Sequence, residues 1–116
     1  MNFGGIDPEY EALEKAAFVV VPVPYDLTTT YQGGARKGPS AILEASCNME
    51  LYDEELDAET YRAGIHTLAP LEAVAAGPEG MLDRVEEAVT DVLETGKIPV
   101  MLGGEHSITL GAVRAV

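Results

Sequence analysis

The sequence predicts an α/β fold in which a mostly parallel sheet is flanked by helices. Three short apolar stretches, at residues 18–21, 63–68 and 98–102, alternate with segments whose apolar residues recur at helical spacing. Strands that alternate with helices are joined by crossover connections, and such connections build parallel sheets. A length of 116 residues fits one domain of ordinary size.

The first predicted helix and strand lie before residue 25. Asp7 is a good N-cap and is followed by proline, which predicts a helix over residues 8–16. Residues 18–21 are β-branched or aromatic without alternation, which is typical of a strand covered on both faces. Pro22 and Pro24 are expected to end this strand, because proline cannot donate to a ladder of hydrogen bonds.

A polar loop over residues 25–37 leads to a second helix that is expected to begin at Pro39. The residues at helical spacing that define its expected buried face are Ile42, Ala45, Met49 and Tyr52. Cys47, the single cysteine, is expected to be a buried small hydrophobe on this helix. One cysteine allows no intrachain disulfide, which fits a reducing compartment and a cytoplasmic location.

The second half of the chain repeats the alternation. A short strand is expected over residues 63–68, and the clearest amphipathic helix over residues 79–95. The apolar stripe of that helix consists of Leu82, Val85, Val89, Val92 and Leu93. Gly96 is expected to end it in a left-handed conformation. Residues 98–102 then predict a strand, and residues 107–116 predict the start of another helix.

Two loops are expected to meet at one edge of the sheet. Functional groups of parallel sheets gather outside the carboxyl ends of the strands. The loop after Val23 and the glycines after Leu102 both follow predicted strands. They should therefore lie side by side.

Charge restricts the partners of the chain. Twenty acidic and seven basic residues give a formal charge of −13, which argues against nucleic acid, because phosphate binding needs clustered lysine and arginine. A negative field attracts cations, so a cationic substrate is compatible with this charge, although solubility is the favoured explanation. Six of the ten residues in Glu50–Glu59 are acidic, and this run is expected to be a solvated helix end and loop.

The apolar stretches and the first residues of the chain predict neither a membrane-spanning segment nor a signal peptide. No stretch approaches the roughly 20 apolar residues that a membrane span needs. The first residues show neither the basic start nor the apolar run of a signal peptide.

The segment whose residue types are best suited to bind a ligand or a metal ion is Gly103-Gly104-Glu105-His106-Ser107. Two glycines after a strand permit a tight turn and a close approach to a ligand, and an imidazole there can bind a metal ion. Spacing alone favours the alternative, in which His106 only packs or caps a strand-to-helix turn. His66, near a strand end and without a partner in the sequence, is expected to be structural. The chain lacks the glycine pattern of a dinucleotide site and the cysteine pairs of a zinc site.

Two segments resemble the ureohydrolases of the agmatinase/arginase family. Leu102–Thr109 is similar to their first metal motif, in which the histidine after two glycines and an acid binds manganese. Pro24–Asp26 and Gly34–Ile42 resemble the loop and helix that follow the first strand in agmatinases. Both segments follow predicted strands and occur in the family's order, and with the pattern between them the resemblance covers essentially all 116 residues.

The resemblance implies a fold, a cofactor and one site residue. Residues 1–116 would be a single partial domain, the N-terminal part of an arginase/deacetylase-like three-layer α/β/α fold. The complete enzyme would hold two manganese ions, and His106 would be a ligand of one of them. Glu105 is expected to support the site or the fold, because neighbouring residues at a helix start face different ways, and Ser107 is expected to cap the helix. No catalytic residue is assigned.

The reaction implied is metal-dependent hydrolysis of a guanidino C–N bond, with agmatine giving urea and putrescine, a step of polyamine synthesis. Guanidinobutyrate and formimidoylglutamate remain open as substrates. Family members assemble into trimers or hexamers, so a homo-oligomer is expected. The loop Thr28–Tyr31 either lines the entrance to the site or is a plain solvated loop.

The resemblance also implies that this sequence is truncated. The later Asp-x-His-x-Asp and Asp-x-Asp motifs, which supply the remaining manganese ligands of the family, do not occur in it. If the 116 residues are the whole gene product, the alternative is a non-catalytic remnant or an interaction module, because one imidazole cannot hold two manganese ions.

Overall fold

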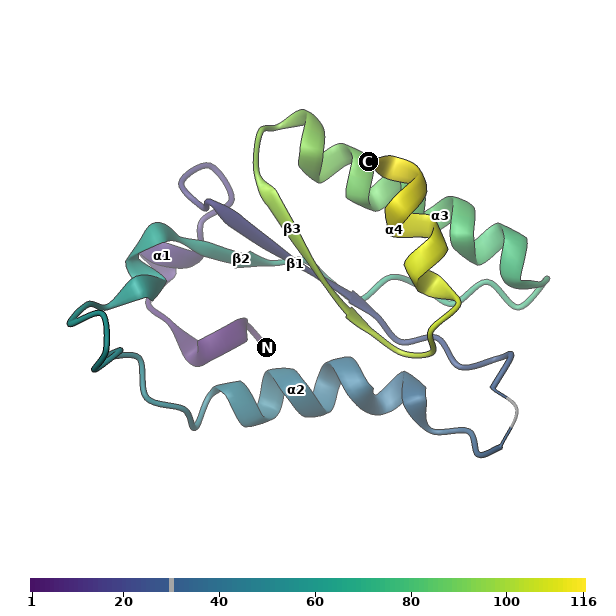
Figure 1. Ribbon diagram of the computed structural model, residues 1–116, viewed down its shortest axis with the longest axis horizontal. Helices are drawn as coiled ribbons and strands as arrows, with labels where there is room; N and C mark the ends of the chain where they lie inside the picture. Colours follow the sequence, from purple (N-terminus) through teal and green to yellow (C-terminus); the bar gives the residue numbers. More distant parts are fainter. Residues whose placement is uncertain (30) are drawn as a thin grey trace.

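The computed structural model describes residues 1–29 and 31–116. Helices (α), 3-10 helices (η) and strands (β) follow in the order η1 (Phe3–Gly5), α1 (Pro8–Glu11), β1 (Phe18–Val23), η2 (Ala35–Lys37), α2 (Gly38–Ser46), η3 (Thr60–Ala63), β2 (Ile65–Thr67), α3 (Pro78–Glu94), β3 (Ile98–Gly103) and α4 (Ile108–Ala115). The strands are parallel and lie in the order β2-β1-β3. Helix α2 covers one face of the sheet and α3 covers the other, with α4 packed against α3 (Figure 1). The predicted α/β fold with a parallel sheet flanked by helices is therefore confirmed.

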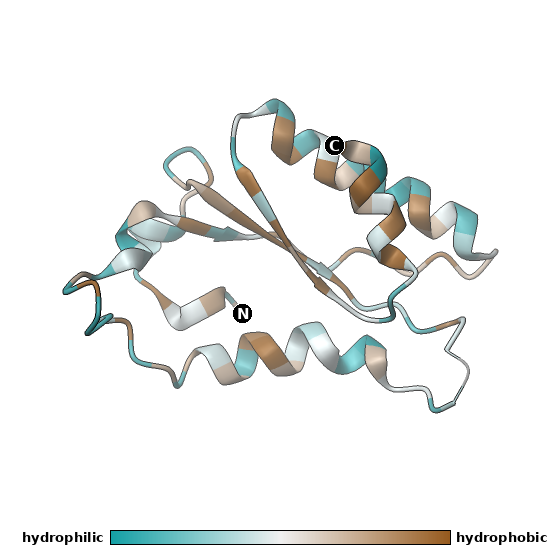
Figure 2. Cartoon of the chain, in the orientation of Figure 1, coloured by the Kyte–Doolittle hydropathy of each residue, from teal (hydrophilic) through white to brown (hydrophobic). Residues whose placement is uncertain are grey.

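The core lies between the sheet and α3. It consists of Val19, Val21, Val23, Tyr25, Met81, Val85, Val89, Val92 and Ile108. Every second residue of β1 points into it, as the period of a strand requires, and four of the five predicted stripe residues of α3 are buried. Figure 2 shows apolar residues along the strands and separate apolar and hydrophilic sectors on α3. Because only this apolar face is buried, α3 packs with that face against the sheet and exposes its hydrophilic face.

Strand β1 continues through Pro22, so the prediction that Pro22 ends it is wrong. β1 pairs with β3 in register from Phe18 to Val23, with Pro22 opposite Leu102. The Pro22 carbonyl accepts from Leu71 N at 3.0 Å, on the side where β2 has already ended. In a parallel strand the N–H and C=O of one residue point to the same neighbour. The missing N–H of Pro22 therefore faces a gap in the ladder, where proline is tolerated.

Helix α1 is much shorter than the predicted 8–16. Lys15 N and Ala16 N both bond to the Ala12 carbonyl, at 3.1 Å each, in a separate turn. The Glu11 carbonyl, which would accept in a continued helix, lies 2.8 Å from His66 Nδ1 on β2. The contact with β2 thus replaces the next helical hydrogen bond, and the chain turns into β1. It also gives His66 a structural role, as predicted.

The predicted buried face of α2 is wrong. The helix ends at Ser46, so two of the predicted residues lie beyond it, and Ile42 is 42% exposed. The buried residues are Pro39, Leu43 and Ser46, which recur at helical spacing. Ser46 can be buried because its hydroxyl donates to the Leu43 carbonyl at 2.6 Å and accepts from Gly4 N at 2.9 Å.

Two further expectations concern the surface after α2. Cys47 is exposed at the end of the helix, not buried as expected, because the helix turns its Leu43–Ser46 side to the sheet. The acidic run Glu50–Glu59 lies in irregular, mostly exposed chain, which confirms a solvated loop. Among the described residues, no helix combines the length and the apolar character of a membrane-spanning segment.

Gly111 allows α4 to pack closely on α3. A Cβ at Gly111 would lie 2.8 Å from the Leu82 carbonyl oxygen and 2.8 Å from Val85 Cβ. Alanine gains about 1 kcal/mol in helix propensity, whereas overpacking against backbone costs about 1–3 kcal/mol. We therefore expect Gly111→Ala to lower the free energy of unfolding by up to about 2 kcal/mol in urea titration. Thr109→Ala, exposed on the same helix, is the control, and equal stability of the two variants would contradict the close packing.

Candidate functional site

The loops after β1 and β3 meet at the carboxyl edge of the sheet, as predicted. Val23 and Gly103 are paired at the ends of the two strands. Beyond them, Glu105 N donates to the Tyr25 carbonyl at 2.8 Å. Both loops lie at the same end of the sheet in Figure 1. The pairing of parallel strands therefore brings together two segments that are far apart in the sequence.

Helix α2 begins directly against the glycine turn. A Cβ at Gly38, its first residue, would lie 2.7 Å from the Gly103 carbonyl oxygen. A side chain at Gly38 would therefore push α2 away from the turn. Gly38, within the segment Gly34–Ile42, therefore lies in contact with the turn that begins the segment Gly103–Ser107.

Glu105 is a buried carboxylate that holds both loops. Its side chain accepts from Thr28 N at 2.7 Å, from the Thr28 hydroxyl, and from the Ser107 hydroxyl at 2.5 Å. Burial raises the pKa of Glu105, but the hydrogen bonds from Ser107 and Thr28 outweigh it, and the net pKa lies below its usual value. Glu105 is therefore an anion whose oxygens are engaged by protein donors.

Asp26 closes the base of the loop after β1. It is buried, with Gly34 N 2.6 Å and Arg36 N 3.4 Å from Oδ2, and Arg36 Nη1 3.6 Å from Oδ1. The hydrogen bond from Gly34 N lowers the pKa of Asp26, against the effect of burial, and Arg36 lowers it further. A charged carboxylate thus ties residue 26 to residues 34 and 36.

Acid should weaken this tie. Because the pKa of Asp26 in the folded chain lies below the ordinary 3.8, the unfolded chain binds the proton first as pH falls. The contribution of Asp26 to stability is complete above about pH 4 and is lost as pH falls through the folded pKa. We expect Asp26→Asn to reduce the loss of unfolding free energy between pH 6 and pH 3, measured in urea. Asp83→Asn, exposed on α3, is the control, and identical pH profiles of wild type and Asp26→Asn would contradict this account.

His106 lies beside an open hollow of about 480 Å³. The lining residues are Thr28, Thr29, Tyr31, Gln32, Glu105, His106 and Ser107. The side chain of His106 is exposed at this hollow, where an imidazole nitrogen can bind an ion. Within the described residues, no three His, Cys, Asp or Glu side chains gather as a metal site.

The structure also places the neighbours of His106. Ser107 occupies the N-cap of α4, but its hydroxyl donates to Glu105 and makes no capping bond, so the predicted capping role is wrong. The buried carboxylate competes for the hydroxyl because a charge-assisted bond is stronger. Of the loop Thr28–Tyr31, the described residues line the hollow, and Thr30 lies outside the described residues.

Asp26 and Thr28 lie in two segments singled out from the sequence, Pro24–Asp26 and Thr28–Tyr31, but the sequence predicted no separate role for either residue. Asp26 lies three residues after the end of β1 at Val23, so a carboxylate close to the carboxyl edge of the sheet was a signal for it. Thr28 carried no such signal, because its partner Glu105 is 77 residues away.

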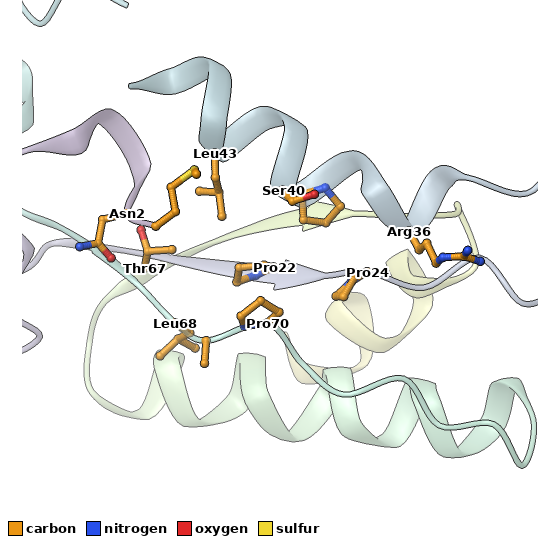
Figure 3. Close-up of a pocket in the computed structure, with 12 residues that line it drawn as sticks. Asn2, Pro22, Pro24, Arg36, Ser40, Leu43, Thr67, Leu68 and Pro70 are labelled. Atoms are coloured by element: carbon orange, nitrogen blue, oxygen red, sulfur yellow. The ribbon is translucent and has the colours of Figure 1, made fainter. Parts of the chain in front are cut away.

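A second hollow, of about 440 Å³, lies between α2 and the sheet (Figure 3). Apolar groups such as Pro22, Leu43 and Leu68 line it. Among the described residues, the charged side chain that lines it is that of Arg36, which is 60% exposed and pairs with Asp26. The hollow beside His106 is therefore the stronger candidate for chemistry.

Known proteins resemble this chain along nearly its whole length. The arginase family model matches residues 16–116. The N(1)-aminopropylagmatine ureohydrolase of Synechocystis sp. is 45% identical over 106 residues, covering 87% of this chain and 35% of that protein. The chain thus spans about a third of the length of this relative.

Solved structures agree with the fold. The agmatine ureohydrolase of Thermoplasma volcanium superposes with a TM-score of 0.82 and 41% identity, over 89% of this chain and 35% of that one. A formiminoglutamase of Trypanosoma cruzi, solved with Mn²⁺, gives a TM-score of 0.80 at 24% identity, over 91% of this chain and 37% of that one. At that identity the second likeness shows the fold alone.

Proposed function

Because this chain belongs to the arginase family, whose model covers residues 16–116, we propose that the full-length gene product is a manganese-dependent ureohydrolase. It hydrolyses a guanidino C–N bond to urea and an amine, with agmatine as the first candidate substrate. Residues 1–116 form the first segment of a larger ureohydrolase domain. The observation that carries the proposal is His106, exposed on a glycine turn at the carboxyl edge of a parallel sheet.

His106 is proposed as a manganese ligand. Its ring is exposed at the hollow, whereas the neighbouring Glu105 carboxylate is occupied by Thr28 and Ser107. When bound, divalent metal ions supply hydroxide near neutral pH by lowering the pKa of water. Imidazole with oxygen ligands suits manganese. The chain's own contribution is a rigid turn that holds the ring at the edge of the hollow.

The substrate is proposed to be a guanidine with an amine at its far end. The Synechocystis relative is named for N(1)-aminopropylagmatine and the Thermoplasma relative for agmatine. Both molecules carry a guanidino group and at least one amine, and both are cationic. A net charge of −13 raises the local concentration of such cations.

The test is urea release by the purified full-length gene product. The protein is loaded with manganese and given agmatine, N(1)-aminopropylagmatine, arginine or guanidinobutyrate at equal concentrations. We expect turnover of at least one of the two amine-tailed guanidines, and slower turnover of arginine and guanidinobutyrate, which carry a carboxylate. No urea from any of them, together with no uptake of manganese, would favour a non-catalytic remnant.

A further inference from the structure

We propose that the loop after β1 selects the substrate by the charge at its far end, and that Glu105 is the positioning residue that holds this loop beside His106. The inference rests on the proposed function and deepens it. It assigns a substrate-binding role to Tyr31 and Gln32 and a positioning role to Glu105 and Thr28.

Glu105 fixes the loop on the side that faces His106. It accepts from both the backbone N–H and the hydroxyl of Thr28, and a third bond comes from Ser107 on the other side of His106. One carboxylate therefore binds a residue of the loop and a residue of the histidine turn. Hydrogen bonds to a buried charge are among the stronger ones in proteins, so the spacing between the two segments is well determined.

Asp26 fixes the same loop at its base. Its bonds to Gly34 N and Arg36 N bring the two ends of the loop together. The Thr29 hydroxyl also donates to the Asp26 carbonyl at 3.0 Å. The loop is thus closed at its base by one carboxylate and held against the turn by another, and its outer residues Tyr31 and Gln32 line the hollow.

The outer residues suit a cationic group. Tyr31 lines the hollow and is 91% exposed, and exposed Gln32 adds an amide oxygen. An aromatic face attracts an ammonium group, and an amide oxygen accepts a hydrogen bond from it. A hollow of about 480 Å³ is of the size that holds a small ligand. If the guanidino group of the substrate lies at His106, the ammonium group at its other end would contact Tyr31 and Gln32 of this loop.

The positioning role is tested with Thr28→Val and Thr28→Ser in the full-length protein. Valine removes only the hydroxyl bond to Glu105, and serine restores it. We expect Thr28→Val to speed hydrogen–deuterium exchange in residues 26–36 and to raise KM for agmatine, each about tenfold, with kcat within twofold. Thr28→Ser should behave as wild type, and manganese content should not change in either variant.

Glu105→Gln should have the same effects as Thr28→Val, again with unchanged manganese content. Glu87→Gln, an exposed charge change on α3, is its control. A loss of manganese in Glu105→Gln, or unchanged exchange in Thr28→Val, would overturn the positioning role.

The selecting role is tested with Tyr31→Ala and Tyr31→Phe. The substrates are agmatine and pentylguanidine, which has a methyl group in place of the terminal ammonium. We expect the wild type to prefer agmatine in kcat/KM, Tyr31→Ala to reduce this preference about tenfold, and Tyr31→Phe to keep it. An unchanged preference in Tyr31→Ala would overturn the selecting role.

The outcomes separate this inference from the proposed function. If the wild type releases urea but shows no preference for agmatine, the proposed function stands and the selecting role fails. If it releases no urea, the proposed function fails. In that case the exchange measurement still decides the positioning role, and calorimetric affinities for agmatine and pentylguanidine decide the selecting role, because neither needs turnover.

Discussion

His106→Ala is expected to weaken manganese binding by the full-length protein by more than about 100-fold, because even partners outside the ligand set cost 10–100-fold. A comparable loss of urea release should accompany it. The side chain is exposed, so its removal should leave the melting temperature nearly unchanged. The measurements are elemental analysis after dialysis, a manganese titration, and urea release from agmatine.

The control for His106→Ala is His66→Ala. His66 is the other histidine of the chain, lies on β2 and contacts the Glu11 carbonyl. This variant should lose stability but retain manganese. Full manganese content in His106→Ala, or equal losses in the two variants, would refute the ligand assignment.

The sheet could be predicted from the sequence because its signals are local. Residues 18–21 and 98–102 are apolar runs bounded by proline or glycine, and the stripe of α3 recurs at helical spacing. The meeting of the two loops also followed, since parallel strands end at one edge. The prediction of His106 as a metal ligand rests on its motif, and spacing alone favoured a packing or capping role.

The errors arose where a distant contact decided the local structure. Pro22 stays in β1 because β2 is short, and α1 stops because β2 takes its next acceptor. Ser46, a polar residue, lies on the buried face of α2 because Gly4 and Leu43 satisfy its hydroxyl. Apart from Leu43, which is three residues from Ser46, these partners lie outside the window that a periodicity argument uses.

The candidate site shows the same division. The turn that carries His106 is local, whereas the wall beside it depends on bonds from Glu105 to Thr28 across 77 residues of sequence. Burying a carboxylate costs free energy unless it is hydrogen-bonded. Asp26 accepts from Gly34 N and Glu105 accepts from Thr28 N, and both donors belong to the loop after β1. The need to satisfy these two charges gives the loop its defined shape.

Gly104→Ala is expected to be the most damaging single substitution at this edge. Gly104 has φ +72°, which costs an L-residue about 1–2 kcal/mol. A Cβ there would also lie 2.6 Å from the Val23 carbonyl oxygen and 2.7 Å from the Tyr25 carbonyl oxygen. These are backbone atoms at the end of β1 and in the loop that follows it, so they cannot rotate away as a flexible side chain would. Crowding of this kind costs a further 1–3 kcal/mol or so, and we expect a total loss of about 2–5 kcal/mol in unfolding free energy.

Gly96→Ala separates the two costs of Gly104→Ala. Gly96 has φ +77°, and a Cβ there meets no atom within 4 Å, so its substitution measures the backbone cost alone. The difference between the two variants in urea unfolding is the crowding cost, expected at about 1–3 kcal/mol. Because the crowding displaces the loop after β1 from the His106 turn, Gly104→Ala should also raise KM for agmatine, whereas Gly96→Ala should not. Equal stabilities and equal KM values would mean that the two loops can separate freely, and that the close contact at Gly104 does not shape the site.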